Sequence, residues 1–101
     1  EGWKNFKTMS EMSRKRSKRE MEKAYLSLKG RELKAAKLVG RSVCLKRNGK
    51  LLSSNQGDFV VDGLKKLGYS EQEMDALMSE KLILASNWHT LKLLKSENCL
   101  E

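Results

Sequence analysis

The sequence predicts an α+β fold that is mostly α-helical, with a long basic N-terminal helix, one β-hairpin at about residues 43–54, and a small C-terminal helical bundle. Three observations support this fold class. A capping box opens a proline-free stretch at residues 8–30, an Asn-Gly pair stands between two runs of strand formers, and later apolar residues recur at helical spacing. A chain of 101 residues corresponds to one domain, here a basic, partly extended helix over 1–30 and a compact core over 31–98.

The N-terminal helix is predicted to start at the capping box of residues 8–11, in which Thr and Glu side chains satisfy backbone N–H groups. Its second half has an apolar face at i, i+4 and i+7, formed by Met21, Tyr25 and Leu28. The first half has no such face, so we expect it to extend from the core. Helical composition resumes after Gly30, and Gly40 suits the position just past the end of that next helix.

The hairpin is predicted from Asn48-Gly49, because both central residues of a tight type I′ turn need positive φ, which Asn and Gly tolerate best. A two-residue loop places Arg47 opposite Lys50. One face of the hairpin then has two cations at its tip and an apolar base, formed by Val43, Leu45 and Leu52. Like charges directly opposite each other are mildly unfavourable, so this tip would gain from an anion.

Two helices are predicted after the hairpin. Asp58 is the candidate N-cap of a helix over 59–67, and a second capping box at residues 70–73 opens an amphipathic helix. The string Leu67-Gly68-Tyr69-Ser70 ahead of that helix resembles the loop of ubiquitin-associated-type three-helix bundles, and no binding residue is carried over from that family. The second helix is acidic, which argues against a helix–turn–helix that reads the major groove of DNA.

The stretch over residues 82–95 fits two structures. A last helix would place Trp88, Leu91 and Leu94 on one face, whereas two strands would occupy 82–85 and 90–94. We favour the helix.

Two cysteines, Cys44 and Cys99, are too few for the disulfide framework of a small secreted domain. We expect Cys44 to be a small buried apolar residue and Cys99, in a polar tail, to be a free thiol. Both expectations indicate a reducing, intracellular location, cytoplasmic or nuclear. No apolar run approaches the roughly 18–20 residues that span a bilayer, so we expect no membrane partner.

The net charge of +8 is unevenly distributed, with 12 Lys and Arg against 5 Glu in residues 1–40 and 9 against 8 acidic residues in residues 41–101. A basic half predicts an anionic partner. The strongest feature is the run over residues 14–19, whose cations could neutralise phosphates or could form a solvated, salt-bridged helix with Glu11 and Glu22. The predicted nucleic-acid-binding residues are Arg14, Lys15, Arg16, Lys18, Arg19, Lys34, Lys37, Arg41, Lys46, Arg47 and Lys50.

These patterns favour a nucleic-acid-binding accessory or regulatory protein, DNA- or RNA-binding, that contacts the phosphate backbone through the basic helix and the hairpin tip. The alternative is a protein–protein interaction module, an adaptor or a homodimer, whose basic face binds an acidic partner. Its partner-binding residues would be Met74, Met78 and Trp88. We expect no enzyme activity, cofactor, metal or small-molecule substrate, because His89 is the only histidine and neither metal-ligand spacing nor a Gly-rich phosphate loop is present.

Overall fold

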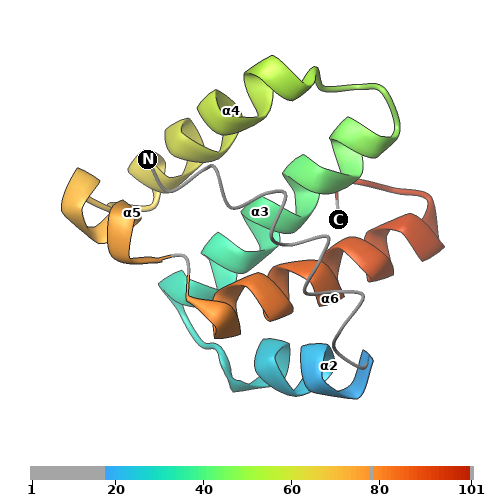
Figure 1. Ribbon diagram of the computed structural model, residues 1–101, viewed down its shortest axis with the longest axis horizontal. Helices are drawn as coiled ribbons and strands as arrows, with labels where there is room; N and C mark the ends of the chain where they lie inside the picture. The colour runs from blue at the N-terminus through green and yellow to red at the C-terminus, as the bar shows by residue number, and fades with distance from the viewer. Residues whose placement is uncertain (1–17, 78, 101) are drawn as a thin grey trace.

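Two 17-residue helices, α3 (Arg31–Arg47) and α6 (Glu80–Ser96), pack against each other at the centre of the fold. The computed structural model describes residues 18–77 and 79–100. On the outer side of α6 lies α2 (Lys18–Ser27), and on the outer side of α3 lies α4 (Ser53–Lys66), so the order across the molecule is α4, α3, α6, α2 (Figure 1). The short α5 (Glu71–Leu77) connects α4 to α6.

Over the described residues the structure is all α-helical, so the predicted α+β class is wrong. The predicted hairpin does not form: residues 43–47 are the last turns of α3, and residues 53 and 54 begin α4. Asn48-Gly49 ends the helix instead. The Gly49 N–H bonds to the Lys46 carbonyl and the Lys50 N–H to the Leu45 carbonyl, which is a Schellman motif with Gly49 at φ 70°.

Gly40 was expected just past the end of a helix, but it lies inside α3. A Cβ at this position would lie 2.9 Å from the Ser86 carbonyl oxygen and 3.0 Å from Cβ of His89. The missing side chain therefore lets the backbone of α6 approach that of α3. Thr90 of α6 strengthens the same contact, because its hydroxyl lies 3.0 Å from the Gly40 carbonyl oxygen.

Several predicted helix features are confirmed. Residues 82–95 form a helix, α6, and not two strands. The capping box at residues 70–73 is formed reciprocally: the Ser70 N–H donates to a Glu73 carboxylate oxygen at 3.0 Å, and the Glu73 N–H donates to the Ser70 hydroxyl at 3.2 Å. The helix predicted over 59–67 is present as α4, which begins earlier, at Ser53. The capping box at residues 8–11 lies outside the described residues.

The main core lies between α3, α4 and α6 and is closed by residues of α5 and of the loop before it. Its fully buried members include Ala35, Ala36, Val39, Val60 and Leu64. One polar pair is buried beside it, where Gln56 Nε2 donates to the Ser42 hydroxyl at 3.3 Å and that hydroxyl donates to the Val39 carbonyl at 2.6 Å. Buried polar groups of this kind are tolerated because they are hydrogen-bonded. No described helix is long and apolar enough to cross a membrane.

Cys44 and Cys99 form a disulfide, with their Cα atoms 5.6 Å apart. The expectation that Cys99 is a free thiol is therefore wrong, whereas Cys44 is buried as predicted. The bond joins the C-terminal part of α3 to the segment after α6, and Leu93 packs beside it. Disulfides persist mainly in oxidising compartments, so this bond argues against the predicted reducing location.

Candidate functional site

Three cations of α3 line one hollow between α3 and α4. Lys34, Lys37 and Arg41 follow one another at i, i+3 and i+7, which places them on the same face of the helix. The hollow has a volume of about 420 Å³, and its remaining lining residues are Leu38, Gly63 and Leu67. All three cations were predicted as nucleic-acid-binding residues from the sequence, and the structure brings them together.

The close approach of α4 to α3 shapes this hollow. Gly63 of α4 has no side chain, and a Cβ there would collide with both Cδ atoms of Leu38. Leu38 therefore packs directly on the α4 backbone. The hollow is lined by two leucines, Leu38 and Leu67, as well as by the three cations.

A second group of cations surrounds His89 of α6. The imidazole is 6% exposed and stacks on Tyr25 of α2, with ring centroids 5.9 Å apart and planes at 5°. Neither ring nitrogen has a hydrogen-bond partner among the described residues. The pKa of His89 is lowered to about 4, first by burial and then by the positive charges of Arg41, Lys37 and Lys92, in that order of size. His89 is therefore neutral at pH 7 while cations from two helices face it.

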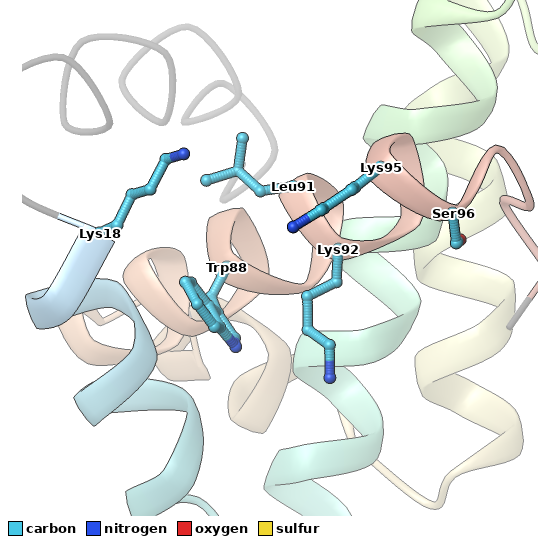
Figure 2. A pocket seen from close by; sticks show the side chains of 6 residues that line it. All are labelled: Lys18, Trp88, Leu91, Lys92, Lys95 and Ser96. Carbon is cyan, nitrogen blue, oxygen red and sulfur yellow. The ribbon is translucent and has the colours of Figure 1, made fainter.

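A larger hollow of about 690 Å³ lies between α6 and the start of α2 (Figure 2). Trp88, which is half-buried, and Leu91 provide its apolar surface. Three lysines stand around them: Lys18 from α2, and Lys92 and Lys95 from α6. Lys92 is also one of the three cations that lower the pKa of His89, with Lys37 and Arg41 of α3. We call this site the Trp88 hollow, and its lining residues are Lys18, Trp88, Leu91, Lys92, Lys95 and Ser96.

The other predicted cations are placed differently. Lys46, Arg47 and Lys50 are exposed at the C-terminal end of α3, where positive charge complements the helix dipole. Arg19 is exposed on α2, and Arg14, Lys15 and Arg16 lie outside the described residues.

Arg31, the first residue of α3, is held by contacts within the fold. Its guanidinium lies 4.1 Å from the ring centroid of Tyr69, donates to the Gly68 carbonyl at 3.1 Å, and pairs with Glu73 at 3.0 Å. The pKa of Glu73 is lowered, first by its hydrogen bonds to Ser70 and then by Arg31. Burial raises the pKa of Tyr69, and Arg31 opposes that shift.

The predicted partner-binding residues do not form one surface. Met74 is buried in the main core, Trp88 lines its hollow, and Met78 lies outside the described residues. Sequence reasoning missed Lys92 and Lys95. The signal was their spacing from Trp88, at i+4 and i+7, which places these residues along one side of a helix only if residues 82–95 are helical.

No group of three or more metal-ligating side chains occurs among the described residues. No family model matches the sequence, and no curated protein or solved structure is significantly similar to it.

Proposed function

We propose that the protein binds nucleic acid through contacts between its basic surface and the phosphate backbone. The observation that supports this proposal is the gathering of Lys34, Lys37 and Arg41 in one hollow. Cations held this close repel each other, and a polyanion relieves that repulsion. Each phosphate contact also releases counterions from the nucleic acid, which supplies sequence-independent affinity.

The contact surface in this proposal differs from the one expected from the sequence. A rigid helix face replaces the hairpin tip, because residues 43–47 belong to α3. Cations at i, i+3 and i+7 of one helix span about 10 Å along its axis. Phosphates of one strand are spaced by several ångströms, so neighbouring phosphates can meet successive side chains of this row without a change in the backbone of α3.

The protein-interaction alternative has less support. Of its three predicted contact residues, Met74 is buried in the core. Lys34 and Lys37, by contrast, line a surface hollow with Arg41 and need no rearrangement to meet an anion.

The test is a salt titration of binding to a fluorescent oligonucleotide, comparing the parent protein with Lys34→Gln/Lys37→Gln. We expect the logarithm of the binding constant to fall linearly with the logarithm of salt concentration, and the double variant to lose about 2 from the slope on duplex DNA. The matched control is Lys65→Gln/Lys81→Gln, which removes the same charge from exposed positions away from the hollow and should leave the slope nearly unchanged. Absence of binding at about 50 mM salt, or equal slopes for the two double variants, would contradict the proposal.

A further inference from the structure

The Trp88 hollow combines an apolar aromatic surface with a rim of positive charge. Trp88 and Leu91 form the apolar part, and Lys18, Lys92 and Lys95 surround it (Figure 2). Its volume of about 690 Å³ lies within the range of about 300–1,000 Å³ that is usual for small-molecule sites. A matching ligand therefore has a flat apolar part joined to negative charge on more than one side.

A nucleotide within a single strand has this composition. Its base offers a π-face that stacks on an indole, and the phosphates on either side of it carry the negative charges. In a duplex the bases are stacked and paired inside the helix, so only the phosphates could reach these lysines. The hollow therefore distinguishes a single strand from a duplex, which a row of cations alone does not.

We propose that the Trp88 hollow binds an unpaired base of single-stranded nucleic acid, with Trp88 stacking on the base and Lys18, Lys92 and Lys95 contacting the neighbouring phosphates. This inference rests on the proposed function, and it names the substrate class: single strands in preference to duplexes. DNA and RNA share the chemistry that the hollow recognises.

Continuity with the α3 cations supports the same occupant. Lys92 lines the Trp88 hollow and, with Lys37 and Arg41, acts on the buried His89. Its Nζ lies 5.8 Å from the ring centroid of Tyr25, which stacks on that imidazole. A strand with one base on Trp88 would therefore pass Lys92 and reach the cations of α3.

An acidic protein segment with an aromatic residue would meet the charge requirement. It would not, however, supply regularly spaced anions along the path from Lys95 past Lys92 to Lys37.

The experiment measures Trp88 fluorescence in a full-length Trp3→Phe background, because Trp3 and Trp88 are the two tryptophans of the chain. The probes are a 12-mer of thymidine, a duplex of the same length, an abasic 12-mer with the same number of phosphates, and an acidic peptide that contains Phe. We expect the thymidine strand to quench Trp88 most strongly, and the abasic strand and the duplex to quench it little.

Variants then assign the effect to the site. Trp88→Ala should weaken single-strand binding by about 5- to 100-fold, the range found for loss of one stacked base, and should leave duplex binding within about twofold. Trp88→Phe retains a π-face and should recover most of the affinity, which separates lost stacking from lost folding. Lys95→Gln at the exposed rim tests the charge without removing apolar packing, and should weaken binding to both the thymidine and the abasic strand.

The outcomes are distinct. Equal affinity for duplex and single strand with unchanged Trp88 emission overturns this inference and leaves the proposed function intact. Failure of every oligonucleotide to bind at low salt overturns both. Binding of the acidic peptide with quenching of Trp88, together with no binding of any oligonucleotide, overturns both in favour of a protein partner at the Trp88 hollow.

Discussion

The Cys44–Cys99 disulfide should supply a large share of the stability of this small fold. The bond closes a loop between positions that are 55 residues apart, which includes α4, α5 and α6. In the chain-entropy treatment, a loop of this length removes about 14 cal/mol/K from the unfolded ensemble, or about 4 kcal/mol at 25 °C. The free energy of unfolding of native proteins is usually about 5–15 kcal/mol, so loss of the bond would remove about a quarter or more of the stability.

The perturbation is Cys44→Ala/Cys99→Ala, compared with the parent protein with and without a phosphine reductant. Alanine is preferred because Cys44 is fully buried, and a serine hydroxyl there would require a new hydrogen bond. Urea unfolding followed by circular dichroism should show the unfolding free energy of the parent falling by about 2–5 kcal/mol on reduction. The melting temperature should fall by about 8–40 °C, given the usual slope of about 4–8 °C per kcal/mol.

The double variant is also the control, because its stability should not respond to the reductant. Alkylation of the denatured, unreduced protein followed by mass measurement reports the thiols directly. Alkylation of both cysteines in the unreduced parent protein, together with an unfolding midpoint that does not change with reductant, would refute both the bond and the free energy assigned to it.

Three further predictions concern single side chains. The pKa of His89 is lowered from 6.5 to about 4, so on acidification the unfolded chain takes up the proton first. The free energy of unfolding should therefore fall between pH 6.5 and 4, by at most roughly 3 kcal/mol. His89→Phe should flatten this pH dependence, measured by urea unfolding at a series of pH values. Gly63→Ala should destabilise the fold by about 1–3 kcal/mol, because its Cβ meets Leu38, and a thermal melt that matches the parent would contradict the close packing of α3 and α4. Arg31→Ala removes an exposed salt bridge and a cation–π contact with Tyr69, so it should cost only about 1 kcal/mol in urea unfolding; a loss above about 3 kcal/mol would show a larger structural role.

The error at residues 43–54 has an identifiable physical cause. Asn48-Gly49 supplies positive φ, and that property serves a type I′ turn and the C-terminal cap of a helix equally well. The choice between them depends on the residues before it. Val43 has strand propensity, but packing of the α3 face against α6 overrides it, because propensity amounts to only a few tenths of a kcal/mol per residue. The local sequence therefore shows that the chain turns at residues 48 and 49, but it does not show α6, whose packing against α3 makes the turn a helix end.

The capping box at residues 70–73 was predictable because all of its hydrogen bonds lie within four residues. Gly40 was not predictable, because its role is contact with Ser86 and His89, which are more than forty positions away. The disulfide was missed for a similar reason. Two cysteines so far apart give no local signal of pairing, and only the packing of α6 on α3 brings the segment that contains Cys99 beside Cys44.

In the candidate site, too, features within one helix could be predicted and features that depend on distant contacts could not. Lys34, Lys37 and Arg41 were predictable as a group because they lie on one face of one helix. The Trp88 hollow depends on α6 being helical and on α2 lying beside it, and residues 82–95 left helix and strand both open. Only the fold reveals that Lys92 belongs to both cation groups.

The basic surface and the disulfide depend on different parts of the α3–α6 contact. The closest approach of α6 to α3 is near Gly40, where the two backbones meet without an intervening side chain and the Thr90 hydroxyl donates to the Gly40 carbonyl. The disulfide lies further along, at Cys44. Reduction should therefore lower stability without moving the cations, as long as the protein stays folded. We therefore expect the proposed nucleic-acid binding not to require the disulfide, and expect reduction to lower the folded fraction without changing the affinity of the folded protein.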